Sequence, residues 1–278
     1  MAKTRERWSG RFGFVLATIG SAVGLGSIWK FPYEVGTNGG SAFVVFYLAG
    51  LAFIVFPLLL AEFSIGRRGR SDTAGSIASV AEANRVSSRW SLVGSLGVLS
   101  SYLILSFYSV IGGWTIAYAL GGMLHGLPGA AAAEVQARFD TLLASPLEMG
   151  VYHAAFMLIT AVIVARGIMH GIEAAVRILM PVLIVLIVGL AVYSILEGDA
   201  AAATRFMFSL DLDRFTGQAA LEAVGLGFFS ISVGLGLMIV YAAYAGPEIN
   251  LRQVALITIV SDTAISFLSG FAIFPIVF

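Results

Sequence analysis

The tetrapeptide Val-Gly-Leu-Gly occurs twice in the chain, at Val23–Gly26 and again at Val233–Gly236. Each copy lies in the middle of a stretch that is apolar enough to cross a lipid bilayer. Glycine is about 1 kcal/mol worse than alanine in a helix, so two glycines at one depth predict a break in the helix. Because the bilayer core offers no water to the freed N–H and C=O groups, such a break has to line a cavity or contact a ligand.

The spacing of the two motifs predicts where they meet. They lie 210 residues apart, as expected for two halves of a duplicated protein whose broken helices meet near the bilayer midplane. Close packing of helices through small residues is the alternative interpretation of either break alone. Because the motif is repeated, we favour the midplane site, and the pattern predicts a secondary transporter.

The composition is that of an integral membrane protein. Hydrophobic residues make up 59% of the 278 residues and charged residues only 12%, which is too few to cover a soluble domain. The sequence contains no cysteine, which excludes disulfides and thiolate metal sites. It also lacks a phosphate-binding loop, a catalytic-triad pattern and a metal motif. We therefore expect neither ATP-driven transport nor enzyme activity, and the basic residues require no nucleic acid.

Apolar segments of about 20 residues are long enough to span a bilayer, and they predict an all-α polytopic membrane protein. Polar loops separate seven of them. The predicted spans are 11–36, 41–66, 90–124, 149–166, 174–196, 218–244 and 251–278.

The basic residues predict the orientation of these spans. With the N-terminus inside, twelve of the 16 Lys and Arg residues fall in inner segments, and only Lys30, Arg138, Arg205 and Arg214 fall in outer ones. Because basic loops stay on the cytoplasmic side, we expect a multi-pass protein of the cell (inner) membrane with a cytoplasmic N-terminus.

Polar residues within the spans are candidates for ion and substrate binding. Carbonyl oxygens that end a half-helix suit a hard cation, and the amides that begin the next half-helix suit a carboxylate. Asp262 lies inside the last span beside Ser261 and Ser266, and because a charge is costly there we expect it to be functional. Glu62 and Glu222 are interpreted instead as structural or interfacial residues.

Several short motifs follow one another along the whole chain. They are Arg5-Glu6-Arg7-Trp8-Ser9-Gly10-Arg11, Gly20–Gly26, Lys30-Phe31-Pro32, Asn38-Gly39-Gly40, Gly112-Gly113-Trp114, Arg166-Gly167-Ile168, Gly171-Ile172-Glu173, Phe228–Gly236 and Ser266–Gly270. In this order they resemble the neurotransmitter:sodium symporter family, and most closely its bacterial amino-acid transporter branch.

The resemblance implies the inverted-repeat (5+5) amino-acid transporter fold, with helices 1 and 6 broken at mid-membrane. Residues 1–200 would form the first five-helix repeat, and residues 201–278 the start of a second repeat with helices 6 and 7. Family members have eleven or twelve spans, so we expect this chain to be the N-terminal portion of a longer protein, truncated after about seven helices.

The function implied by the resemblance is sodium-coupled symport of an amino acid by alternating access. A truncated, non-transporting membrane receptor or assembly protein of the same family is the alternative. A passive channel is disfavoured because paired breaks form a closed site rather than a ring of pore-lining polar groups. The implied partners are a small amino acid and the lipid bilayer, with a homodimer left open.

The resemblance also places the ligands. The substrate carboxylate would meet amides of the first break and a tyrosine hydroxyl, and its ammonium would meet carbonyls of both breaks, beside a pocket for an apolar or aromatic side chain. The implied substrate-binding residues are Ala22, Gly24, Leu25, Gly26, Ile104, Tyr108, Phe229, Ser230, Ser232 and Leu235.

Sodium and gate residues follow from the same motifs. The first sodium would be bound by Ala22, Ser27, Ser230 and Asp262, and the second, in part, by Gly20 and Val23. The implied gate residues are Arg5, Trp8, Lys30 and Tyr244.

Three positions depart from the family pattern. Ser27 and Asp262 stand where asparagine is common, and Leu226 stands where chloride-dependent members have glutamine. Because Asp262 supplies a fixed negative charge and Leu226 removes a polar ligand, we expect that chloride is not required.

Overall fold

The computed structural model describes residues 7–126 and 132–278, and within these ranges the chain is helical and contains no strand. The all-α class predicted from the sequence is therefore confirmed. In chain order the elements are α1 (Arg11–Ala22), η1 (Gly26–Lys30), α2 (Phe31–Thr37), α3 (Ser41–Gly50), η2 (Leu51–Val55), α4 (Phe56–Gly69), α5 (Thr73–Ala83), η3 (Ser88–Trp90), α6 (Ser91–His125), α7 (Ala132–Leu143), α8 (Pro146–Ala165), η4 (Ile168–Glu173), α9 (Ala174–Glu197), α10 (Ala200–Phe208), η5 (Leu212–Arg214), α11 (Gly217–Ile231), α12 (Leu237–Ala243) and α13 (Leu251–Val277).

Six of the predicted spans are present as apolar helices or helix pairs in the described part of the chain. Five are long enough to cross a membrane: Ser41–Gly69, Ser88–Leu124, Pro146–Ala165, Ile168–Glu197 and Leu251–Val277. The sixth is the pair Arg11–Ala22 and Gly26–Thr37, which bends by 49° at its break. The segment predicted at 218–244 contains two short helices, α11 and α12, so it too is broken.

Three of the helical stretches contain a π-helical turn. These turns are η1, η2 and η4, and each continues directly into the α-helix that follows it. A π-helical turn accommodates one extra residue within a helix and is often found at functional sites. The η1 turn begins at Gly26, within the first glycine motif.

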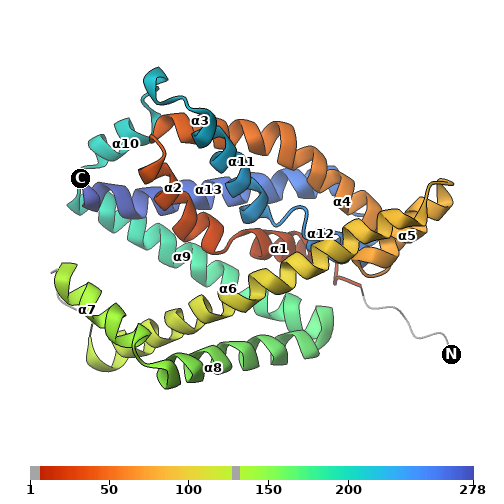
Figure 1. The fold of residues 1–278 in the computed structure, drawn as a ribbon, viewed down its shortest axis with the longest axis horizontal. Coiled ribbons are helices and arrows are strands. Elements are labelled where there is room, and N and C mark those ends of the chain that lie inside the picture. Colours follow the sequence, from red (N-terminus) through yellow and green to blue (C-terminus); the bar gives the residue numbers. More distant parts are fainter. Residues whose placement is uncertain (1–6, 127–131) are drawn as a thin grey trace. The chain divides into compact units, whose positions relative to one another are not determined.

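The chain divides into two compact units, Met1–Gly97 with Ile168–Phe278, and Val98–Gly167. In the first unit, α13 packs along α9 and α1 and also contacts α4, whereas α11 lies beside α3 and α12 beside α4 (Figure 1). The core of this unit mixes aliphatic and aromatic side chains, and its fully buried aromatic residues include Phe14, Phe31, Phe43 and Tyr47. The predicted boundary at residue 200 separates two sequence repeats, not two compact units. The division into compact units does not test it, so it stays a prediction.

The second unit consists of most of α6 together with α7 and α8. Glycines let α6 and α8 approach closely, as is common between membrane helices. A β-carbon at Gly113 would lie 2.8 Å from the backbone nitrogen of His153. The ring of Trp114 on α6 meets Phe139 of α7 edge-on, with 5.2 Å between the ring centroids.

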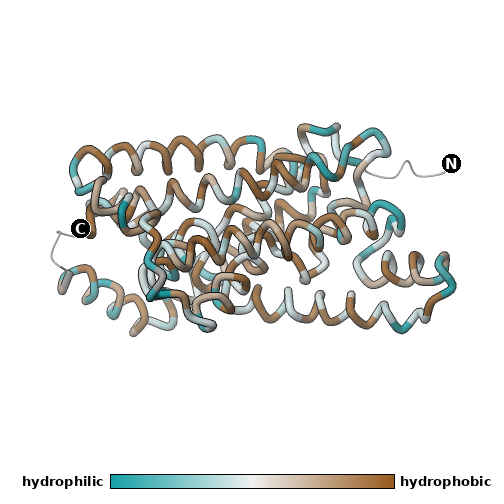
Figure 2. Tube along the Cα trace, turned by 90° about the horizontal axis from the view of Figure 1, so that it is seen from above, coloured by the Kyte–Doolittle hydropathy of each residue, from teal (hydrophilic) through white to brown (hydrophobic). Residues whose placement is uncertain are grey.

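Large apolar side chains are exposed along the helices. Figure 2 shows hydrophobic residues along the lengths of the helices and hydrophilic residues mainly at turns and helix ends. On α9, for example, Ile178, Val185 and Leu196 are 68%, 70% and 76% exposed. Apolar patches of this extent are unfavourable in water and match a surface that contacts lipid.

A substitution at Gly66 tests the packing of α4 against α12. A β-carbon at this position would collide with the carbonyl oxygen of Ile239. We expect Gly66→Ala to lower the free energy of unfolding by about 1–3 kcal/mol, the usual cost of overpacking. The measurement is thermal unfolding of the purified protein in detergent.

Gly189 provides the matched control for this substitution. It lies within α9, and a β-carbon there would meet no atom within 4 Å. Gly189→Ala is expected to be neutral or stabilising, because alanine favours the helix by up to about 1 kcal/mol. Equal effects of the two substitutions would refute the close contact between α4 and α12.

Candidate functional site

The first break lies where the sequence predicted it. The α-helix ends at Ala22, Val23 adopts an extended conformation (φ −76°, ψ 106°), and regular hydrogen bonding resumes at Gly26. The amide of Ile28 donates to the carbonyl of Gly24 at 3.0 Å, which begins the second half-helix. The carbonyls that end α1 and the amides that begin η1 therefore face one gap.

The second break lies at the second Val-Gly-Leu-Gly motif, as the sequence predicted. Helix α11 ends at Ile231, and a turn over 232–236 precedes α12. Ser232, Gly234 and Gly236 all have positive φ, at 61°, 89° and 79°. Glycine adopts this left-handed conformation without steric cost, which explains the two glycines here.

The two breaks contact each other through small residues. A β-carbon at Gly26 would lie 3.0 Å from Cα of Ser230 and 3.3 Å from the ring of Phe229. The absence of a side chain at Gly26 thus lets the backbone of one break approach the other, although the two are about 200 residues apart in sequence. This confirms the predicted meeting of the two broken helices.

Four oxygen-bearing side chains converge beside this contact. The hydroxyl of Ser230 lies 2.9 Å from that of Ser27 and 2.9 Å from each carboxylate oxygen of Asp262. The hydroxyls of Ser27 and Tyr47 also donate to Asp262, the latter at 3.2 Å. Ser27, Tyr47 and Asp262 are fully buried, and Ser230 is 3% exposed.

This oxygen cluster suits a hard cation of low charge. Hard cations prefer oxygen ligands, and one buried carboxylate balances a single positive charge. The described residues contain no group of three or more His, Cys, Asp or Glu that could bind a metal ion, which disfavours a multivalent or soft ion. Three of the four residues predicted for the first sodium are neighbours here, and the fourth, Ala22, ends α1 at the same break.

Glu62 contributes to the site in a way that sequence reasoning missed. Its carboxylate, 9% exposed, accepts a hydrogen bond from the amide of Gly234 at 2.7 Å. The prediction assigned Glu62 a structural or interfacial role without a partner, and its partner is the second break itself. A glutamate within an apolar span was the available signal. Its partner lies 172 residues away, so spacing alone could not identify it.

The predicted gate residues that the structure describes lie at the ends of the first unit's broken helices. The indole of Trp8 donates to the carbonyl of Tyr241 at 2.8 Å, and its amide donates to that of Tyr244 at 3.4 Å, so the start of α1 is joined to α12. The ammonium of Lys30 lies 5.2 Å from the ring centroid of Phe229 and 3.8 Å from Glu34. Arg5 lies outside the described residues.

The residues predicted for the second sodium lie on the other side of α1. Gly20 faces α9, where a β-carbon would be 3.0 Å from Val176. Val23 is buried with Met180 of α9 and Ile265 of α13. The structure therefore places these backbone positions at the junction of α1, α9 and α13.

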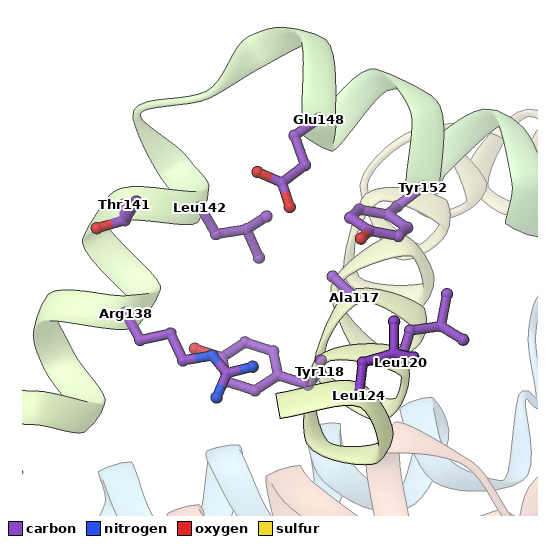
Figure 3. A pocket seen from close by; sticks show the side chains of 10 residues that line it. Ala117, Tyr118, Leu120, Leu124, Arg138, Thr141, Leu142, Glu148 and Tyr152 are labelled. Atoms are coloured by element: carbon purple, nitrogen blue, oxygen red, sulfur yellow. The ribbon is translucent and has the colours of Figure 1, made fainter. Parts of the chain in front are cut away.

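Ile104 and Tyr108 belong to the second unit. Both lie on α6, four residues apart, and so share one face of that helix. The same unit has a cavity of about 340 Å³ that does not include them. Figure 3 shows this cavity between α7, α6 and α8, with the Arg138 guanidinium lying over the ring of Tyr118 and Glu148 on the opposite wall.

Comparison with known proteins gives one consistent result. A model of the "Sodium:neurotransmitter symporter family" matches residues 5–141 and 143–278. The sodium-dependent transporter YhdH of Bacillus subtilis is 36% identical over 98% of this chain and 59% of its own length. The sodium-dependent dopamine transporter of Bos taurus is 27% identical over 98% of this chain and 44% of its own length.

A solved structure is also closely similar. The crystal structure of MhsT in complex with L-phenylalanine matches with a TM-score of 0.90 at 41% identity, over 98% of this chain and 61% of that one. The chain thus spans about three fifths of the length of this structure and of YhdH.

The bond between Glu62 and Gly234 can be tested by paired substitutions. Glu62→Ala removes the carboxylate acceptor of the Gly234 amide, which we expect to lower the free energy of unfolding by about 1–3 kcal/mol. Glu62→Gln keeps an acceptor oxygen at the same reach and should retain most of the stability. Thermal unfolding in one detergent gives the comparison, and identical loss in both variants would contradict the role of the hydrogen bond.

Proposed function

Because the chain belongs to the sodium:neurotransmitter symporter family, a family of membrane transporters rather than enzymes, we propose that it forms the substrate site and the first sodium site of a sodium-coupled amino-acid symporter. The observation that carries the proposal is the buried oxygen cluster of Ser27, Ser230 and Asp262 at two facing helix breaks. Sodium is a transported ion in this proposal.

The substrate would bind across the two breaks. The backbone amides at the start of η1, on Leu25 and Gly26, would hold its carboxylate, because a helix N-terminus attracts negative charge. The carbonyls of Ala22, Phe229 and Ser230 would accept from its ammonium, with Ser232 nearby and Gly24 leaving room. Ile104 and Tyr108 of α6 and Leu235 complete the proposed set.

An apolar or aromatic side chain is the proposed substrate class. The ring of Phe229 borders the contact between the breaks, and the family resemblance adds Ile104 and Leu235 to the proposed pocket. MhsT, which is 41% identical to this chain, was solved with L-phenylalanine. Both observations support a hydrophobic amino acid over a charged one.

Alternating access would use the contacts at the two ends of the broken helices. We place the protein in the cell (inner) membrane with its N-terminus in the cytoplasm. In this orientation Trp8, with Arg5 and Tyr244, would gate the inner side, and Lys30 would gate the outer side. Opening the inner side would break the hydrogen bonds from Trp8 to Tyr241 and Tyr244. Gly20 and Val23 would supply part of the second sodium site, and a homodimer remains open.

A non-transporting binding protein is the second candidate. It would retain the same oxygen cluster and breaks and would bind an amino acid without carrying it across the membrane. Equilibrium binding and uptake distinguish the two functions, because both require sodium-dependent binding but only a symporter accumulates label in vesicles.

The proposal is tested by sodium-dependent binding and uptake of labelled L-phenylalanine. We expect binding in sodium that is lost in potassium, and accumulation in proteoliposomes driven by an inward sodium gradient. Asp262→Asn should weaken the apparent sodium affinity at least tenfold. An ion pair at about 4 Å is worth about 4 kcal/mol at an effective permittivity of 20, and cheaper burial of the neutral amide offsets part of that loss.

Asp140 provides the matched control, because it is an exposed aspartate on α7 whose partner is Gln136. Asp140→Asn should leave the sodium dependence unchanged. Binding of lysine or glutamate in preference to phenylalanine and leucine would refute the substrate class. Binding that is indifferent to sodium in the native protein would refute the proposed function itself.

Chloride dependence gives a separate prediction. The fixed charge of Asp262 opposes a chloride ion close to the first sodium and supplies the balancing charge in its place. We expect uptake to be unchanged when gluconate replaces chloride at constant sodium, and Asp262→Ser to make uptake depend on chloride. A large loss of native uptake in gluconate would contradict charge balance by Asp262.

A further inference from the structure

The connection between α4 and α6 carries an unusual concentration of arginine. Between residues 67 and 90 there are five arginines and two carboxylates, Asp72 and Glu82, so this segment has a net charge of +3. Its two ends join the spans Ser41–Gly69 and Ser88–Leu124. The segment therefore connects two spans on one side of the membrane and lies at the depth of the lipid headgroups.

Most of these arginines have no protein partner in the part of the chain that the structure describes. The guanidinium of Arg67 donates to the carbonyl of Ile249 at 2.8 Å. The ion pairs among the described residues involve other arginines and a lysine, at Lys30, Arg177 and Arg214. Arg68, Arg70, Arg85 and Arg89 are thus exposed cations available to an anion.

The two carboxylates of the segment do not neutralise these arginines. Asp72 caps α5 and accepts from the amide of Gly75 at 2.9 Å. This hydrogen bond lowers the pKa of Asp72, so the group stays ionised in its capping role. Glu82 forms no ion pair within the described ranges.

An apolar groove lies next to two of the exposed arginines. It has a volume of about 250 Å³ and is lined by Ile65, Ile77, Val80, Ala81, Asn84, Val86 and Trp90. Val86 and Trp90 remain 51% and 60% exposed. In sequence, Arg85 lies between two lining residues and Arg89 directly precedes the lining Trp90.

The local backbone fixes this arrangement of charge beside apolar surface. Helix α5 ends with Arg85 in a left-handed conformation (φ 57°), and the amide of Val86 donates back to the carbonyl of Ala81 at 3.0 Å. This turn brings Val86 back against the end of α5, beside Val80 and Ala81. Arg85, whose side chain is exposed, belongs to the same turn.

We infer that this groove binds an anionic phospholipid, with an acyl chain against Ile77 and Val80 and the phosphate on Arg85 and Arg89. The chemistry of the groove matches the two parts of such a lipid. Arginine binds phosphate through two parallel hydrogen bonds, clustered basic residues beside a span attract anionic lipids, and Trp90 is of the type that favours the interface. A soluble anion would leave the apolar groove empty, and a zwitterionic lipid would leave the charge unmatched. This inference is independent of the proposed transport.

Fluorescence quenching of Trp90 by brominated lipids tests the inference. The protein is reconstituted in phosphatidylcholine with a small fraction of phosphatidylglycerol brominated on its acyl chains, and the Trp90→Phe variant supplies the background from the other tryptophans. We expect brominated phosphatidylglycerol to quench Trp90 several-fold more than the same fraction of brominated phosphatidylcholine. The difference should fall as ionic strength rises.

Two kinds of variant distinguish the contribution of the lipid headgroup to binding from that of the acyl chain. Replacing Arg85 and Arg89 by glutamine should lower the preference for phosphatidylglycerol about fivefold for each arginine, whereas Arg205→Gln on α10 should leave it unchanged. Val80→Phe fills the groove without adding a tryptophan and should reduce quenching by both brominated lipids while the arginines remain. Circular dichroism and size-exclusion profiles establish that each variant is folded.

Three results would overturn the inference. These are equal quenching of Trp90 by the two brominated lipids in the native protein, an unchanged preference in the folded double-arginine variant, and full displacement of phosphatidylglycerol by soluble glycerol phosphate. The last result would identify a phosphate site without a role for the groove.

Discussion

The fold depends on one constraint, which is that polar backbone groups released inside a bilayer must find partners within the protein. At the second break, the amide of Gly234 donates to Glu62, and the carbonyl of Gly236 accepts from the hydroxyl of Thr73 at 3.0 Å. These partners come from α4 and from the start of α5. The broken helix is thus stabilised by the helices around it.

A site within the membrane-spanning helices also requires that a carboxylate be buried. Asp262 is fully buried and receives hydrogen bonds from Ser27, Tyr47 and Ser230. Such bonds reduce the cost of burying a charge but do not balance it. A monovalent cation among these oxygens would complete the balance, which is why the proposed sodium site is placed at Asp262.

The sequence was sufficient to predict features that depend on local chemistry. Paired glycines located both breaks, because their conformational cost acts within a few residues, and Asp262, selected for its charge within a span, lies in the buried oxygen cluster. The partner of Glu62 could not be predicted, since it is determined by tertiary packing of α4 on the second break. Likewise, the second break begins one residue before its motif because Ser232 adopts a left-handed conformation, a choice that no local motif specifies. The roles of Ile104 and Tyr108 still rest on resemblance.

The π-helical turns have a consequence for how the lipid-facing surface is deduced. One residue of an α-helix corresponds to a rotation of about 100°, so the extra residue accommodated by a π-helical turn changes the phase of every side chain that follows. In the span Ser41–Gly69, the turn at Leu51–Val55 separates α3 from α4 in this way. A single helical wheel drawn over the whole span therefore assigns one half of its residues to the wrong face. Each half needs its own wheel, and a one-residue gap in an alignment of relatives can be absorbed at this turn without altering the outer surface of either half.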